Sequence, residues 1–347
     1  MKKNQEHFRG CLIGGAVGDA LGWPVEFLRL DEIKEIYGPD GITELDIGIS
    51  GRAEITDDTQ MTLFTAEGLL RAATKGSGQA SSHLPSVVFN AYQRWLVTQG
   101  YQTKGTLEKL DGWLIGISEL HQMRAPGNTC LSALKSGHMG TIDEHINNSK
   151  GCGGVMRAAP AGLFCSKETA FKAGCESAAI THGHPSGYLS TGVLAHVIAC
   201  IIEGMEIEDA VSASLFELAK YTGHEECRNI IQKAVELSQD NTDPQEALAT
   251  LGEGWVGEEA IAIAIYCALK HKSSFRKALY LSVNHNGDSD STGAITGNIL
   301  GAYLGIKAIP NDWVQIVEFA DVIFQLADDL LIGYQDTREW QDKYPGW

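Results

Sequence analysis

Several common sequence features are missing from this chain of 347 residues. Its eight cysteines stand far apart and form no CxxC pair, which excludes zinc ribbons and thioredoxin-type redox motifs. No GK[ST] sequence occurs, so a P-loop is excluded. No run of about 18 apolar residues occurs either. The longest run, VLAHVIACII, is short and holds His196, so we predict no binding to membranes by insertion.

Positive charge is also scarce. The chain has 27 Lys and Arg against 44 Asp and Glu, a formal net charge of −17. Such a surface repels phosphate backbones and anionic lipid headgroups, which excludes binding to nucleic acid or to a membrane surface by bulk charge but allows a local anion pocket. The hydrophobic fraction of 44% excludes wholesale disorder. The N-terminal segment contains Asp19 and no cleavage site typical of a signal peptide, so we predict a helix there and a cytoplasmic protein.

The hydrophobic pattern is helical, and alternating β-branched runs are nearly absent. Phe8, Cys11, Leu12, Gly15 and Ala16 fall on one face of a first helix. The segment at 43–50 is expected to be at most a short strand or a loop. Further helices are predicted over 59–74, 85–98, 168–180, 187–203, 206–220, 225–238, 257–270, 274–283, 292–304 and 312–331. We therefore predict an all-α fold with one compact domain over residues 1–347.

Two short acidic clusters precede predicted helices. Thr56-Asp57-Asp58-Thr59 precedes one, and Asp288-Ser289-Asp290-Ser291-Thr292 precedes the other. Either cluster alone is well explained as a helix cap, because Thr, Ser and Asp are preferred there and carboxylates suit the helix dipole. A cap needs only one good residue, however, and each cluster has two carboxylates with hydroxyls. Two such clusters face to face could hold a pair of Mg²⁺ or Mn²⁺ ions through hard oxygen ligands.

Two further segments are candidates for ligand binding. Gly151-Cys152-Gly153-Gly154 is expected to open a helix, where backbone N–H groups could approach a phosphate; the alternative is a tight turn that packs two helices together. This segment lacks the GxGxxG pattern. His182 and His184 form a His-x-His pair, but no third zinc ligand is evident, so hydrogen bonding at a helix end is the simpler interpretation.

Taken in order, these segments resemble the ADP-ribosylglycohydrolase family. The matching stretches are FRGCLIGGAVGDALGWPVEF, ITDDTQMTL, GCGGVMRAAPAGL, THGHP and NGDSDSTGAITGNILGAYLG. The resemblance is strongest over residues 8–330. It implies an all-α fold of the ADP-ribosylglycohydrolase type, with a central cleft that holds two Mg²⁺ or Mn²⁺ ions, and an enzyme that removes ADP-ribose from modified protein side chains.

The resemblance also implies roles for particular residues. The metal ligands would be Thr56, Asp57, Asp58, Asp288, Asp290 and Ser291. Asp58 and Glu26 would be the catalytic carboxylates, either of which could position the attacking water and carry its proton. The diphosphate and ribose would be bound by Ser149, Lys150, Gly151, Cys152, Gly153, Gly154 and His182. The family often has Asn at the position of Cys152, a departure that bears on the ribose or leaving-group contacts.

Three functions remain open at this point. ADP-ribosyl-arginine is the favoured substrate, because the GDSDSTG and TDDTQ segments look closest to the arginine-directed branch. A hydrolase of another ADP-ribose linkage, such as a serine O-glycoside or a small metabolite, is the second. The third is an immunity-type protein that neutralises an ADP-ribosyltransferase toxin by binding it. The oxygen donors at all six ligand positions favour an enzyme.

Overall fold

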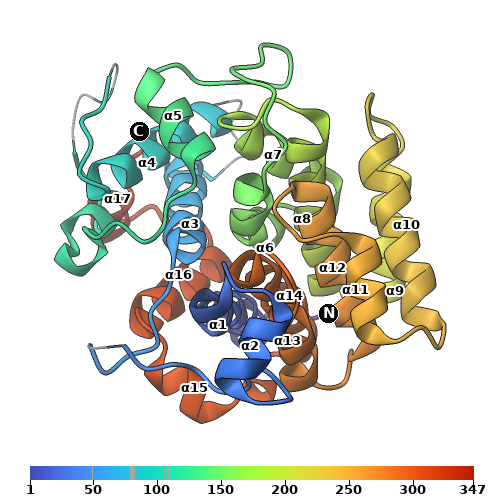
Figure 1. The fold of residues 1–347 in the computed structure, drawn as a ribbon. Coiled ribbons are helices and arrows are strands. Elements are labelled where there is room, and N and C mark those ends of the chain that lie inside the picture. Colours follow the sequence, from blue (N-terminus) through green and yellow to red (C-terminus); the bar gives the residue numbers. More distant parts are fainter. Residues whose placement is uncertain (49, 79–82, 105–106, 108–109) are drawn as a thin grey trace.

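The computed structural model describes residues 1–48, 50–78, 83–104, 107 and 110–347, and these residues form helices joined by loops (Figure 1). Among them the only β-type pairings are two isolated bridges, Ala53 with Val317 and Gly151 with Val256. The all-α prediction is confirmed. The α-helices are α1 (Gln5–Gly22), α2 (Leu30–Tyr37), α3 (Asp57–Lys75), α4 (Leu84–Thr98), α5 (Asn128–Ser136), α6 (Ala159–Phe164), α7 (Lys167–Ala179), α8 (Pro185–Ile202), α9 (Ile207–Leu218), α10 (Glu225–Gln239), α11 (Pro244–Leu251), α12 (Gly257–Lys270), α13 (Phe275–Val283), α14 (Ser289–Leu304), α15 (Asn311–Ile316), α16 (Ala320–Ile332) and α17 (Arg338–Lys343).

The helices α1 and α14 lie side by side near the centre of the molecule (Figure 1). Glycines that recur every four residues on each helix face one another and bring the backbones into contact. A Cβ atom added to Gly14 would lie 2.3 Å from the carbonyl oxygen of Gly297, and one added to Gly297 would lie 1.9 Å from that of Gly14. The same crowding occurs at Gly10 with Gly301 and at Gly18 with Gly293. Only residues without a side chain permit this approach.

This contact fixes which helix ends meet. The two helices run in opposite directions, so the C-terminal end of α1 lies against the N-terminal end of α14. A Cβ atom on Gly22, the last residue of α1, would lie 2.2 Å from the carbonyl oxygen of Ser289, the first residue of α14. The turn that follows α1, a 3-10 helix over Trp23–Val25, therefore leads Glu26 directly to the start of α14.

The prediction of a single helix over 312–331 is wrong. The structure divides it into α15 and α16, and Phe319 between them has a left-handed backbone with φ of 56°. Tertiary pairing explains the break. The N–H of Ala53 donates to the carbonyl of Ile316, and the N–H of Glu318 donates to the carbonyl of Ala53. These bonds hold Val317, which has an extended backbone, beside the segment that leads into α3.

The ends of the other predicted helices differ from those in the structure by at most three residues, and the described part of 43–50 is a loop. The sequence did not predict α2, α5, α6, α11 and α17, which have 6 to 9 residues each. By length and composition, α8 could cross a membrane, and α1 with α2 could form a second span only across a bend of 92°. However, 94% of the α8 window is buried inside the protein, as is usual for a core helix.

Candidate metal centre and substrate cleft

The first acidic cluster is held in place by a buried carboxylate on α1. Asp19 accepts hydrogen bonds from the backbone N–H groups of Thr56 and Thr59, all at 3.1 Å, and from the Thr59 hydroxyl at 2.5 Å. Thr56 is the N-cap of α3, and its hydroxyl accepts from the N–H of Asp58 at 3.2 Å. Capping is thus confirmed for Thr56. The carboxylates of Asp57 and Asp58 are not needed for the cap.

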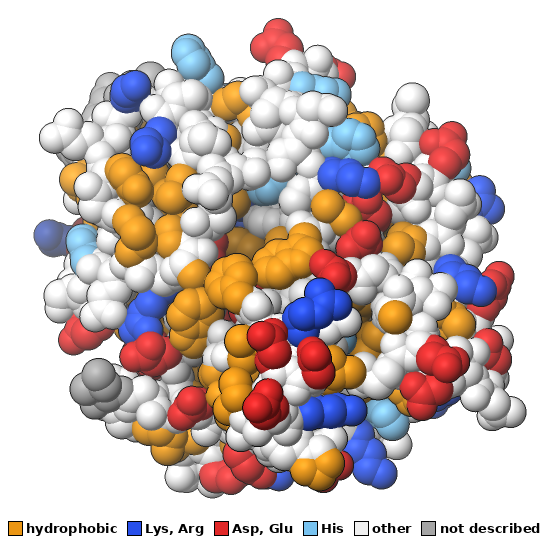
Figure 2. All heavy atoms as spheres, in the orientation of Figure 1, with side chains coloured by type: hydrophobic (Ala, Val, Ile, Leu, Met, Phe, Trp, Pro, Cys, Tyr) orange, Lys and Arg blue, Asp and Glu red, His pale blue; other side chains and the backbone are white. Residues whose placement is uncertain are grey.

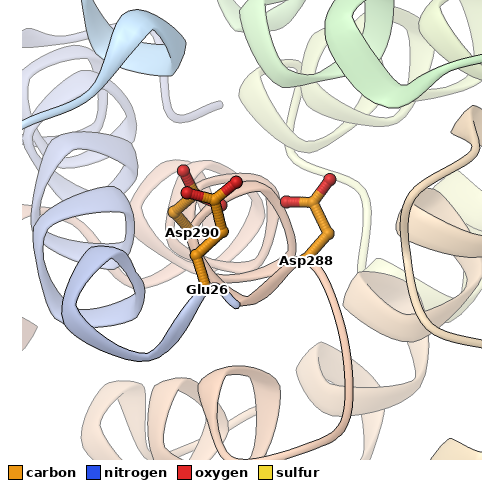
Figure 3. A group of neighbouring side chains, drawn as sticks. All are labelled: Glu26, Asp288 and Asp290. Atoms are coloured by element: carbon orange, nitrogen blue, oxygen red, sulfur yellow. The ribbon is translucent and has the colours of Figure 1, made fainter. Parts of the chain in front are cut away.

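The second cluster forms the start of α14. Asp288 is the N-cap and accepts from the N–H of Ser291 at 3.2 Å, while Asp290 accepts from the same N–H at 2.9 Å. Glu26 approaches from the turn after α1, and the three carboxylates lie close together (Figure 3). One oxygen from each of Glu26, Asp288 and Asp290 lies within 4.8 Å of the other two. The spacing of these oxygens suits a shared cation.

Asp57 and Asp58 of the first cluster and Asp288, Asp290 and Ser291 of the second line one cavity of about 210 Å³, and Thr56 is not among the lining residues. It is lined by Glu26, Asp57, Asp58, Ala125, Gly127, Asn128, Thr129, Cys130, Gly151, Cys152, Gly153, Met156, His182, Trp255, Asp288, Asp290 and Ser291. Five of these residues are acidic, and no Lys or Arg occurs among the described lining residues. The face shown in Figure 2 has a hollow near its centre with hydrophobic side chains beside it.

Burial destabilises the charged forms of Glu26, Asp57, Asp58 and Asp290 in this cavity. Burial, and then the charges of Asp288 and Asp57, raise the pKa of Glu26 to about 9. Burial raises the pKa of Asp57 to about 8, and burial with neighbouring carboxylates raises the pKa of Asp58 and of Asp290 well above the ordinary value. One oxygen of Glu26 and one of Asp58 are buried without a hydrogen-bond partner. A divalent cation would neutralise this charge and use these free oxygens, so the residues fit Mg²⁺ or Mn²⁺.

The glycine segment serves two purposes. It opens a helix as predicted, in the form of a 3-10 helix over Cys152–Arg157 that α6 follows. A ligand could approach the backbone at Gly151, because the nearest atoms to a Cβ added there lie 3.5 Å away. At Gly154 an added Cβ would lie 2.9 Å from both Ala178 and Thr191, so this glycine packs helices together, as the alternative interpretation expected.

Other residues predicted to bind substrate differ in their access to the cavity. Gly151, Cys152, Gly153 and His182 line it. Lys150 does not: its ammonium group pairs with Glu226 and with Glu258, both at 2.5 Å, and so attaches the loop to α10 and α12. Ser149 also lies outside the lining, and its hydroxyl is 3.0 Å from that of Thr129.

His182 is a neutral residue in the wall of the cavity. Burial, and then the charge of Arg157, lower its pKa to about 3. Its Nδ1 lies 2.8 Å from the hydroxyl of Thr181, which also accepts from Arg157 at 2.7 Å. His184 is the N-cap of α8 and accepts from the N–H of Ser186 at 3.1 Å. The hydrogen-bonding interpretation of the His-x-His pair fits both contacts.

Two features of the site were missed in the sequence. Asp19 could have been noticed as a lone carboxylate in an apolar helix, because a fully buried Asp normally has a specific partner. No sequence signal marks the second feature, an aromatic pair at the edge of the cavity. Phe27 follows Glu26, is 69% exposed, and stacks on Trp255 with ring centroids 5.8 Å apart. This pair joins two segments that are distant in the sequence.

The sequence and the fold of this chain are similar to those of known proteins. The profile of the ADP-ribosylglycohydrolase family matches residues 1–340. The chain is 24% identical to mouse ADP-ribosylhydrolase ARH3, over 95% of this chain and 92% of that protein. It is 26% identical to the ADP-ribosyl-[dinitrogen reductase] glycohydrolase of Rhodospirillum rubrum, over 88% of each chain. It is 25% identical to the ADP-ribosylarginine hydrolase Tri1 of Pseudomonas putida, over 93% of this chain and 77% of that one. A solved structure described as an ADP-ribosylglycohydrolase-related protein complex superposes with a TM-score of 0.63 over 96% of this chain and 99% of that one, at 24% identity, and so shares the fold.

Proposed function

The chain belongs to the ADP-ribosylglycohydrolase family, and on this premise we propose that it is a metal-dependent hydrolase that releases ADP-ribose from modified arginine side chains of proteins. The observation that supports the proposal most directly is the cavity itself. Its five carboxylates come from three parts of the chain, and Glu26 and Asp58 each have a buried oxygen without a partner. Such an arrangement is costly for stability and is typical of a functional site.

In this proposal the cation ligands are supplied by the starts of α3 and α14. They are Thr56, Asp57, Asp58, Asp288, Asp290 and Ser291, for two Mg²⁺ or Mn²⁺ ions. When bound, such ions polarise the oxygens that they contact and lower the pKa of a bound water. A carboxylate oxygen of Glu26 lies within 4.8 Å of carboxylate oxygens of Asp288 and Asp290. Glu26 is therefore close enough to share a cation or a water with them.

The chain's own residues then align the substrate and move the proton. Breaking the glycosidic bond produces oxocarbenium character at the ribose, which nearby carboxylates stabilise. The free oxygens of Glu26 and Asp58 can hold the attacking water and accept its proton. Gly151 leaves space beside neutral His182 for the ribose and diphosphate, and the binding energy of these remote groups aligns the reacting bond.

Two observations support arginine as the modified residue. Among the relatives, Tri1 is named for ADP-ribosylarginine. In addition, an acidic cavity whose described lining has no Lys or Arg favours a cationic guanidinium over a neutral serine hydroxyl as leaving group. The names of the relatives support hydrolysis and give no support to toxin binding, so the immunity-type alternative is set aside. A cytoplasmic location stays a prediction.

The proposal is tested by measuring free ADP-ribose released from matched arginine-modified and serine-modified proteins, with Mg²⁺ and with EDTA. We expect faster release from the arginine-linked substrate, and release only when metal is present. Asp58→Asn serves as the matched inactive variant, because it keeps the shape of the side chain but removes its charge. Faster release from the serine-linked substrate would overturn the arginine assignment, and full release in EDTA would overturn metal dependence.

A further inference from the structure

Cys152 brings a sulfur atom into the carboxylate cluster. Its thiol donates to Asp288 Oδ2 at an S–O distance of 2.8 Å, and its sulfur accepts from the hydroxyl of Ser291 at 3.7 Å. The backbone fixes this position, because the N–H of Cys152 donates to the carbonyl of Trp255 at 3.2 Å. The sulfur is therefore held beside Asp288, one of the three clustered carboxylates that could share a cation.

Further donors for a cation face the same space. Asp288 lies in a cluster with Glu26 and Asp290, and one carboxylate oxygen from each of the three lies within 4.8 Å of the other two. Glu26 and Asp58, which line the same cavity as Cys152, each keep a buried oxygen without a hydrogen-bond partner. These free oxygens are available to a cation and do not depend on the cysteine.

Sulfur changes which cations such a site prefers. Mg²⁺ takes hard oxygen ligands and gains little from a thiolate, whereas Zn²⁺ and Cd²⁺ bind thiolates strongly. We propose that this cavity has a second, soft-metal binding mode, in which a thiophilic divalent cation bonds to Cys152 Sγ and Asp288 and competes with Mg²⁺. The new metal–sulfur bond replaces the S–H bond, and the proton that is released goes to the solvent.

Occupation by such an ion is expected to inhibit the enzyme. Zn²⁺ in a site that includes sulfur is usually four-coordinate, so fewer positions remain for water and for ribose oxygens than around octahedral Mg²⁺. The inference uses the ligand set of the proposed function but not the hydrolytic reaction. It can therefore be tested by binding alone, without any turnover.

The test titrates the metal-free full-length protein with Cd²⁺ and follows the thiolate-to-cadmium charge-transfer absorbance in the ultraviolet. Competition with Mg²⁺ is measured in the same cuvette. We expect one saturable band that Cys152→Ser removes, with Cd²⁺ affinity lowered by at least about 10-fold and Mg²⁺ affinity changed by less than about 3-fold. Cys130→Ser is the matched control, since Cys130 lines the same cavity but its sulfur lies 3.3 Å from Arg157.

The outcomes separate this inference from the proposed function. A band that persists in Cys152→Ser, or that disappears in Cys130→Ser instead, overturns the soft-metal mode. Equal losses of Cd²⁺ and Mg²⁺ affinity in Cys152→Ser also overturn it, because the cysteine would then only shape the cavity. A normal band in a protein that releases no ADP-ribose from any substrate would support the soft-metal mode and refute the hydrolase.

Discussion

The contact between α1 and α14 can be tested by adding a single methyl group. In Gly297→Ala the new Cβ would lie 1.9 Å from the carbonyl oxygen of Gly14, and Cβ atoms essentially never approach other atoms closer than 3.0 Å. The two helices must therefore separate locally by about 1 Å. Because Glu26 follows α1 while Asp288 and Asp290 begin α14, this separation changes the distances within the carboxylate cluster.

The substitution Gly297→Ala has two opposite effects on the free energy of unfolding, and the sign of their sum tells whether the helices are in contact. Without a clash, replacing a glycine in a helix interior by alanine would stabilise the protein by about 1 kcal/mol. Overpacking of a tight core contact costs about 1–3 kcal/mol, and here the obstacle is backbone, which cannot rotate away. We therefore expect a net loss of stability. A displacement of about 1 Å at reacting groups can lower the rate by about 100-fold.

The assay combines denaturant unfolding in EDTA with Mg²⁺-dependent release of ADP-ribose. Gly116→Ala is the control, because nothing lies within 4 Å of a Cβ atom added there. We expect this control to stay within about 0.5 kcal/mol of the parent protein and to keep its rate. If Gly297→Ala were as stable and as active as Gly116→Ala, the close helix contact could not be what positions the site.

Three further predictions concern the cavity itself. Asp57→Ala and Asp290→Ala should each lower turnover by at least about 1,000-fold, with unchanged far-UV circular dichroism, since they remove proposed cation ligands that are not part of the hydrophobic core. Retention of more than a tenth of the rate would contradict this. Because the pKa of Glu26 is raised to about 9 and that of Asp57 to about 8, the native metal-free protein holds protons that the unfolded chain loses above about pH 5. Thermal stability in EDTA should therefore fall from about pH 5 to pH 9, while Mg²⁺ binding tightens and releases protons. Constant stability over that range would refute the raised pKa values. Gly153→Val should abolish ADP-ribose binding in calorimetry while Mg²⁺ still binds. An added Cβ would lie 2.9 Å from Cys130 Sγ and 3.0 Å from the ring of His182, so the valine would displace the wall of the cavity. Unchanged ADP-ribose affinity would mean that the loop is only a packing turn.

The fold class, and the starts of α3 and α14 to within three residues, follow from local sequence patterns. Helical periodicity is a local property, so α3, α8 and α12 could be predicted from their own residues. The cap chemistry of Thr56 and Asp288 is local as well, since each side chain bonds within three residues of itself.

Which of these residues meet depends on contacts between distant parts of the chain. Glu26 joins Asp288 and Asp290 because glycines on α1 and α14 let two backbones touch, a fact that depends on both helices at once. The break at Phe319 arises from pairing with Ala53, and Lys150 is occupied because α10 and α12 present Glu226 and Glu258 to it. Each of these outcomes depends on a partner distant in the chain, and local propensity contains no information about such a partner.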